Sequence, residues 1–287
     1  MSHSQKLIKN GQLINENQII KADILIEGNR IKKIAEQINS DASTEIYDAD
    51  GNYIIPGLID DQVHFREPGL THKACIETES KAALAGGITS FIEMPNTSPQ
   101  TTTRTEWEAK NKRASETAYA NYAFMFGGTN DNLEEIKSLD TQRVPALKLF
   151  LGSSTGNMLV DNPDVLKSIF SSTPLVIAVH CEDEETVKSN LNAAKAQYGD
   201  QIPITEHPVI RSEKACYLSS SQAVALAKET GARLHVFHIS TAKELALFQN
   251  DLPLEKKKIT AEVCIHHLWF SDEDYQEKGT HIKWNPA

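Results

Sequence analysis

Apolar and polar residues alternate in short runs along the first 55 residues, with turn-forming residues between the runs. Asn10-Gly11 and Gly28-Asn29 are two such pairs, and alternation interrupted by these residues is typical of strands joined by tight turns. We therefore expect residues 1–55 to form a small β unit that precedes the main domain.

From Pro56 onward the pattern changes to a strand, a loop and a helix, repeated along the chain. Short apolar runs predict seven strands, at residues 57–65, 88–94, 120–126, 145–151, 174–180, 232–239 and 259–265. Segments with helical spacing lie between the strands, for example His72–Ala85, Arg104–Tyr119 and Ser212–Thr230. Glycine follows the first and the last of these segments directly, which is typical of a helix end.

Strands that alternate with helices imply parallel strands joined by helical crossovers, and 287 residues are enough for one α/β barrel. A closed barrel of this kind needs eight strands, whereas the pattern predicts seven. The final segment, residues 281–287, stops in mid-pattern without a closing helix. We therefore expect residues 56–287 to form a barrel domain that lacks its last strand and helix.

The composition narrows the class of partner. The 29 basic and 39 acidic residues give a net charge of −10, which argues against nucleic acid or an anionic membrane as a partner. The sequence contains no apolar run of 18 residues, and its start lacks the apolar stretch of a secretory signal. Cys75, Cys181, Cys216 and Cys264 form no CxxC pair, so we expect reduced thiols in a cytoplasmic protein.

Polar residues interrupt the apolar strands near their C-terminal ends, where a parallel barrel carries its active site. They are His64 in the first strand, Asn96 after the second, Lys148 in the fourth, His180 in the fifth and His238 in the sixth. A single histidine in such a place is more often a hydrogen-bonded core residue. Three histidines on separate strands, together with a lysine, predict one shared site.

Side chains alternate between the two faces of a strand, so positions two apart point the same way. Gln62 and His64 therefore share a face, and both can point into the mouth of a barrel. By the same count His238 shares its face with Val236, whereas His235 points to the opposite side. We assign His238 to the inside of the barrel and His235 to the side that packs against helices.

Imidazole nitrogens on rigid strands suit Zn²⁺, which also accepts oxygen ligands. A catalytic zinc site keeps one position for water, whose pKa the ion lowers toward neutrality. A charged Lys148 would be repelled by such an ion, but its neutral amine can capture CO₂ and become an anionic carbamate that bridges two metals. Pairing of Lys148 with a carboxylate elsewhere in the chain is equally compatible with its spacing.

The segment His64-Phe-Arg-Glu-Pro-Gly places Arg66 on the loop that follows the first strand. A planar guanidinium can hold a substrate carboxylate with two parallel hydrogen bonds. Asn96 and Asn285 could supply amide contacts to the same ligand, although each alone is more often a turn-forming or solvated residue.

These segments resemble those of dihydroorotases in the amidohydrolase superfamily, and they occur in the same order. They are GLIDDQVHFREPGLTHK, EMPNTSP, LKLFLG, VIAVHCED, LHVFHIST, ITAEVCIHHLWF and IKWNP. The resemblance covers almost the whole chain. HFREPG is its most specific part, whereas VHCE and HIST are shared with hydantoinases and allantoinases.

The resemblance implies a TIM-like (β/α)₈ barrel of metal-dependent hydrolases, with a small β-sandwich to which residues 1–55 contribute. It implies a zinc-dependent, reversible interconversion of N-carbamoyl-L-aspartate and L-dihydroorotate in pyrimidine biosynthesis, with one or two zinc ions, a small-molecule substrate and a homodimer. By motif position the metal ligands would be His64, His180, His238 and a carboxylated Lys148, and the substrate contacts would be Arg66, Asn96 and Asn285.

The chain departs from the family pattern in two places. Gln62-Val63-His64 stands where the family usually has His-x-His, and because an amide oxygen is a weaker zinc ligand, we expect the first metal position to be loosely held. The catalytic aspartate of the family follows the eighth strand and has no match before Ala287. We therefore expect a truncated and inactive fragment, and we assign structural roles to Asp60, Glu262 and the pair His266-His267.

Two alternatives remain open. A hydantoinase or allantoinase would need no carboxylate clamp at Arg66. A non-catalytic scaffold subunit would explain Gln62, but the presence of His64, Lys148, His180 and His238 argues against it.

Overall fold

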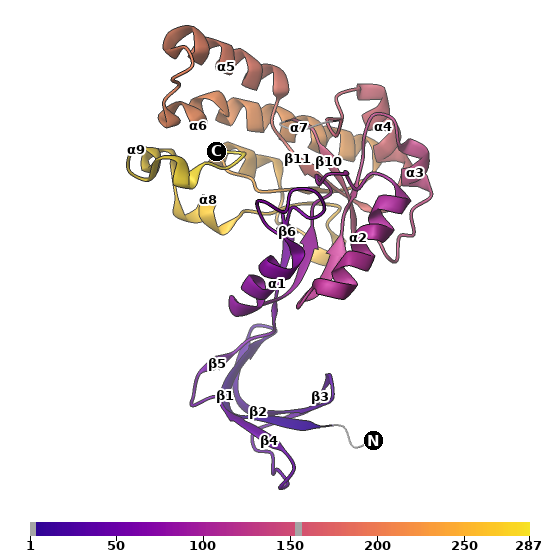
Figure 1. The fold of residues 1–287 in the computed structure, drawn as a ribbon, viewed down its shortest axis with the longest axis vertical. Coiled ribbons are helices and arrows are strands. Elements are labelled where there is room, and N and C mark those ends of the chain that lie inside the picture. Colours follow the sequence, from indigo (N-terminus) through magenta and orange to yellow (C-terminus); the bar gives the residue numbers. More distant parts are fainter. Residues whose placement is uncertain (1–3, 153–156) are drawn as a thin grey trace. The chain divides into compact units, whose positions relative to one another are not determined.

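The computed structural model describes residues 4–152 and 157–287, and the chain divides into two compact units, Met1–Leu58 and Ile59–Ala287 (Figure 1). The first unit is a five-stranded sheet with the order β3-β2-β1-β4, in which β5 also pairs with β1. Its strands are β1 (Gln5–Asn15), β2 (Gln18–Glu27), β3 (Arg30–Ala35), β4 (Glu45–Asp48) and β5 (Tyr53–Ile54). β1, β2 and β3 are antiparallel neighbours, whereas β4 and β5 run parallel to β1.

One predicted turn of this unit is instead an irregularity inside a long strand. β1 continues through Asn10-Gly11, where its register with β2 shifts and Asn10 adopts a φ of 57°. The turn between β1 and β2 falls at Glu16-Asn17, two residues with positive φ. Asn-Gly marks a backbone that turns locally, and a β-bulge satisfies that requirement as well as a hairpin loop does. The turn at Gly28-Asn29, between β2 and β3, lies where it was predicted.

The second unit contains the seven predicted strands, one of them broken into two pieces. They are β6 (Leu58–Val63), β7 (Ile88–Glu93), β8 (Asn121–Phe124) with β9 (Phe126–Gly127), β10 (Ala146–Phe150), β11 (Val176–His180), β12 (Arg233–Val236) and β13 (Ile259–Ala261). Their order in space follows their order in the chain, β6-β7-β8 in one sheet and β9 to β13 in the next. The pairs β7–β8 and β9 to β13 are parallel, so this is the predicted α/β barrel architecture in incomplete form.

Helices connect and surround these strands (Figure 1). They are α1 (Ile76–Ala85), α2 (Arg104–Thr117), α3 (Leu133–Lys137), α4 (Pro163–Ser172), α5 (Glu184–Tyr198), α6 (His207–Ile210), α7 (Glu213–Thr230), α8 (Ile265–Trp269) and α9 (Tyr275–Lys278). Short 3₁₀ turns lie at Ile204–Glu206, Ala242–Leu247, Leu254–Lys256, Asp272–Asp274 and Gly279–Ile282.

The two longest predicted helices are confirmed nearly to the residue, whereas α1 begins at Ile76 and not at His72. The Glu67 carboxylate, from the loop after β6, accepts the Ile76 N–H at 2.9 Å and satisfies one of the free donors of the first turn. Helix α7 has the expected ends, since the Ser212 hydroxyl accepts the Ala215 N–H at 3.4 Å and Gly231 follows with a φ of 73°.

The two faces of the barrel strands carry different side chains. Leu147 and Leu149 of β10 and Val179 of β11 belong to the large apolar cluster that also contains helix residues. Ala146 and Ala178, which alternate with them, lie in a separate small cluster with Phe237. The first face therefore packs against helices, and the second is the inner face of the barrel.

The prediction that His235 faces the helices is wrong. His235 lies opposite Ala178 in β11 and Thr260 in β13, and its Nδ1 lies 2.8 Å from the Thr260 hydroxyl, so it belongs to the inner face. The alternation of side chains between strand faces does not extend to His238, because β12 ends at Val236. The chain then turns at His238, which has a φ of 38°, and this turn directs His238 inward.

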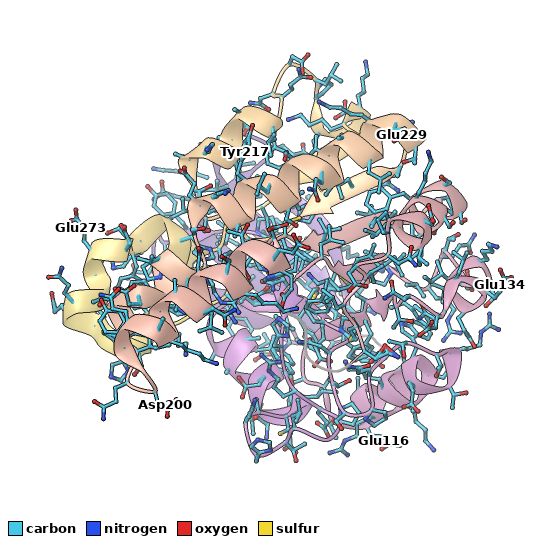
Figure 2. The ribbon with its side chains drawn as sticks, turned by 90° about the horizontal axis from the view of Figure 1, so that it is seen from above. Glu116, Glu134, Asp200, Tyr217, Glu229 and Glu273 are labelled. Atoms are coloured by element: carbon cyan, nitrogen blue, oxygen red, sulfur yellow. The ribbon has the colours of Figure 1, made fainter. Side chains whose placement is uncertain are left out.

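The outer surfaces of the helices are polar. Figure 2 shows Glu116 of α2, Glu134 of α3 and Glu229 of α7 at the periphery, and all three residues are exposed. All four cysteines are free thiols, as predicted. Among the helices of the described segments, none is both long enough and apolar enough to cross a membrane.

Candidate active site

The predicted site residues lie around one cavity of about 410 Å³. They are Gln62, His64, Arg66, Asn96, Lys148, His180, His238 and Asn285. Seven of them lie within, or shortly after, the strands β6, β7, β10, β11 and β12. Asn285 lies among the last residues of the chain. The structure thus brings these positions together near the C-terminal ends of the strands, where a parallel barrel carries its active site.

His180 and His238 lie next to each other in the wall of this cavity. Nδ1 of His180 lies 3.1 Å from Nε2 of His238, and both side chains are buried. Two nitrogens that share one tetrahedral zinc ion are roughly 3.3 Å apart, because each Zn–N bond is about 2.0–2.1 Å. Burial lowers the pKa of both rings, most strongly for His238, so both are neutral imidazoles. This pair fits a metal ion.

Glu182 fixes the orientation of His180, and the sequence analysis did not single it out. Nε2 of His180 lies 2.7 Å from a Glu182 carboxylate oxygen, and Glu182 also forms an ion pair with Arg211. A carboxylate accepts hydrogen bonds, so Nε2 carries the proton and Nδ1 keeps its lone pair for an ion. The spacing His180-Cys181-Glu182 in the HCED segment was the available signal.

We expect Glu182→Gln to weaken zinc binding at the His180–His238 pair by about 10–100-fold. This is the usual effect of removing a carboxylate that is hydrogen-bonded to a zinc-binding histidine. Competition with a chromogenic chelator measures this change. Glu185→Gln is the matched control, since Glu185 is exposed in the first turn of α5. Equal zinc affinities of Glu182→Gln and the control would show that Glu182 does not orient the ring.

Lys148 is fully buried on the inner face of β10. Its Nζ has no hydrogen-bond partner among the described residues and lies 4.2 Å from the ring centroid of Phe237 and 4.7 Å from that of Phe150. Aromatic faces stabilise an ammonium, but the loss of solvation outweighs them and lowers the lysine pKa to about 7. Among the described residues no carboxylate forms an ion pair with Lys148, although the charge of Glu262 raises its pKa. An amine with a lowered pKa fits the carbamate chemistry.

Gln62 and His64 lie side by side at the end of β6, as predicted from their spacing. The Gln62 side-chain nitrogen is 3.5 Å from Nε2 of His64, and the Gln62 oxygen lies 3.7 Å from the Cys264 sulfur. Burial is the largest cause that lowers the His64 pKa to about 3, followed by the charges of Arg66 and Lys148. His64 is thus neutral and available as a ligand, whereas its neighbour offers only an amide.

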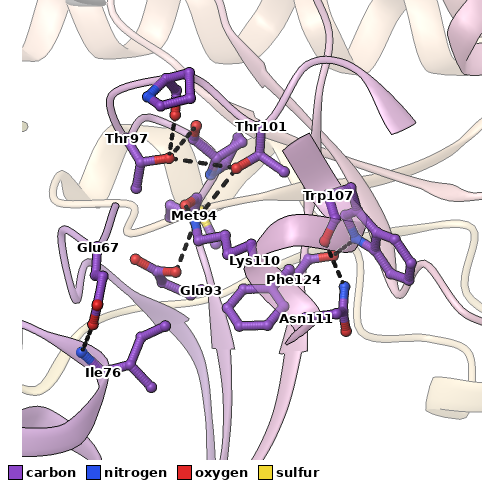
Figure 3. A network of polar contacts seen from close by, with 12 residues as sticks. Glu67, Ile76, Glu93, Met94, Thr97, Thr101, Trp107, Lys110, Asn111 and Phe124 are labelled. Carbon is purple, nitrogen blue, oxygen red and sulfur yellow. Dashed lines mark hydrogen bonds and ion pairs between the residues drawn. The ribbon is translucent and has the colours of Figure 1, made fainter. Parts of the chain in front are cut away.

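A buried ion pair joins the end of β7 to helix α2 (Figure 3). Glu93, at the end of β7, contacts Lys110 of α2 at 2.7 Å, and both side chains are almost completely buried. Burial raises the pKa of Glu93, whereas Lys110 and the backbone N–H groups of Arg66 and Phe65 lower it; Arg66 adopts a φ of 66°. Nζ of Lys110 donates to the Met94 carbonyl oxygen at 3.0 Å. A charged residue inside the apolar run ITSFIEM was the signal for this pair.

The chain belongs to the dihydro-orotase-like family, whose model matches residues 51–244. It is 33% identical to a dihydroorotase of Methanosarcina mazei over 97% of this chain and 62% of that protein. It is 31% identical to an allantoinase of Deinococcus radiodurans over 98% of this chain and 63% of that protein. Among solved structures, an L-hydantoinase of Arthrobacter aurescens superposes with a TM-score of 0.90 at 27% identity, covering 100% of this chain and 63% of that one. The chain thus spans less than two thirds of the length of these relatives.

Proposed function

We propose that the chain is part of a zinc-dependent cyclic-amide hydrolase that interconverts N-carbamoyl-L-aspartate and L-dihydroorotate in de novo pyrimidine biosynthesis. The observation that carries the proposal is the convergence of His180, His238 and the buried Lys148 on one cavity, with Arg66 lining the same cavity. The similarity to dihydroorotases favours this substrate. A cytoplasmic location and a homodimer are part of the same proposal.

His180 and His238 would hold one zinc ion, with Lys148 as a carbamate serving as a further ligand, and His64 beside Gln62 would hold a second ion weakly. The carbamate forms when the neutral Lys148 amine attacks CO₂, making an N–C bond and releasing one proton. When bound, zinc supplies Lewis-acid activation of water and of the amide carbonyl. The neutral states of the buried histidines favour this loading, because a protonated imidazole has no lone pair for an ion.

Arg66 would select the substrate. Its side chain is half-buried at the cavity, and burial is the main cause that lowers its pKa while the Glu93 charge raises it. A guanidinium in this place can grip the carboxylate that dihydroorotate carries and that hydantoin and allantoin lack. Asn96, which interacts with His64, and Asn285 would add amide contacts.

Binding of dihydroorotate to the zinc-loaded chain tests this assignment. We expect Arg66→Met to weaken binding by about 10–100-fold, since a hydrogen bond to a charged group contributes about 1.5–3 kcal/mol. Hydantoin binding should not change. Isothermal titration measures both affinities, and Arg104→Met, at an exposed position, serves as the control.

A hydantoinase or allantoinase, favoured by the L-hydantoinase fold similarity, predicts the opposite pattern. In that case hydantoin or allantoin binds more tightly than dihydroorotate, and Arg66→Met leaves all three affinities unchanged. A scaffold subunit predicts that the chain binds no zinc at the His180–His238 pair.

A further inference from the structure

A second group of metal-ligand side chains lies in the wall of the same cavity, outside the His180–His238 pair. Cys264 precedes α8, and His266 and His267 lie within it. One donor atom from each of the three lies within 4.8 Å of the other two. All three residues are partly buried, so the group is neither a surface cluster nor part of the apolar core.

His267 is oriented as a metal ligand would be. Its Nε2 lies 3.3 Å from the Pro286 carbonyl oxygen, which can only accept a hydrogen bond, so Nε2 carries the proton. Nδ1 therefore keeps its lone pair, and it is buried without a hydrogen-bond partner among the described residues. A buried acceptor without a partner is costly, and an ion at this point would satisfy it. Burial lowers the pKa of this ring to about 4, so the lone pair is free near neutral pH.

The other two donors are also held in place. The His266 ring stacks on Trp284 with 4.2 Å between ring centroids, which restricts its rotation. The Cys264 sulfur lies 3.7 Å from the Gln62 side-chain oxygen, so this amide adjoins the group and offers an oxygen donor. Burial, followed by the charges of Glu262 and Asp60, raises the Cys264 pKa to about 12, so the thiol is protonated without a metal.

We propose that Cys264, His266 and His267 bind a thiophilic divalent cation, such as Zn²⁺ or Co²⁺, at a site separate from the His180–His238 pair. One sulfur and two imidazole nitrogens are the donor set that zinc prefers, whereas Mg²⁺ and Ca²⁺ require oxygen. The Cys264 S–H bond breaks on binding, a sulfur–metal bond forms, and the proton leaves to solvent. The ion would also secure residues 283–287, which contact both histidines through Trp284 and Pro286.

Anaerobic titration of the 287-residue chain with Co²⁺ tests the site, because only a thiolate ligand gives a sulfur-to-cobalt charge-transfer band in the near ultraviolet. We expect this band in the unmodified chain and in the double variant His180→Asn/His238→Asn. Cys264→Ser should abolish it, and His267→Asn should weaken Co²⁺ binding at least 10-fold. Cys75→Ser, which alters another partly exposed thiol, is the matched control and should keep the band.

X-ray absorption of the unmodified zinc-loaded chain gives a second readout that needs no variant. We expect a sulfur neighbour at about 2.3 Å from zinc. The proposal is overturned if the spectrum contains only nitrogen and oxygen neighbours, if no band forms with Co²⁺ bound, or if the band survives in Cys264→Ser. The proposed function is tested by dihydroorotate binding and this site by the cobalt band and the sulfur neighbour, so either can fail while the other holds.

Discussion

Replacing Lys110 with methionine should lower the free energy of unfolding of the barrel unit by about 3–5 kcal/mol, the usual cost of leaving one member of a buried ion pair without its partner. The Glu93 carboxylate would remain buried next to an apolar side chain, and its pKa is already raised by burial, the largest influence on it. Lys110 also donates to the Met94 carbonyl oxygen, so its loss leaves a second buried acceptor without a partner. Urea unfolding followed by tryptophan fluorescence measures the change, since Trp107 lies on the same helix.

Two further variants separate the lost ion pair from a simple change of shape. Lys112→Met, on the exposed side of α2, should stay within about 0.5 kcal/mol of the unmodified chain. Glu93→Leu combined with Lys110→Met should recover most of the loss, because an apolar pair of similar size often replaces a buried ion pair at little cost. If Lys110→Met unfolds at the same urea concentration as Lys112→Met, the pair does not stabilise the barrel unit.

The second large effect concerns the metal pair. We expect His180→Asn to lower zinc affinity at this site more than about 100-fold, because it removes a ligand. Removing only the carboxylate that is hydrogen-bonded to a ligand lowers zinc affinity by about 10–100-fold. The measurement is chelator competition in a Cys264→Ser background, so that zinc held near α8 does not contribute. His72→Asn, at an exposed position, is the control and should bind zinc as before. Unchanged zinc affinity in His180→Asn would exclude His180 as a ligand.

The strands that carry this site could be predicted from the sequence, because a parallel barrel combines short apolar strands with functional residues at their C-terminal ends. Apolar runs located all seven strands, and the rule that function lies at strand ends brought His64, Lys148 and His180 to one cavity. Those residues lie within regular strands or directly after them, where the direction of a side chain follows from its position.

The errors arose where the backbone leaves regular geometry. His235 was placed on the wrong face because β12 stops before His238, and a single residue with positive φ redirects the chain. The pair Asn10-Gly11 predicts a hairpin turn, but the same residues also suit the bulge that the structure contains. Strand periodicity contains no information about where a strand stops being regular.

The residues that support the site were missed for another reason. Glu182 and the Glu93–Lys110 pair act through partners that are distant in the sequence, such as Arg211 and the backbone of Arg66. A charged residue in an apolar run signals that a partner exists, but only the fold identifies that partner. The convergence of Cys264, His266 and His267 is likewise visible only in three dimensions.

We infer that strand-end side chains direct their ligand atoms to one point in the cavity. Crystals of the chain grown with zinc, measured on both sides of the zinc absorption edge, locate the ion directly. We expect an anomalous peak between Nδ1 of His180 and Nε2 of His238, in the cavity that Lys148 also lines. Zinc found elsewhere in the crystal, with no peak between these two rings, would contradict this inference.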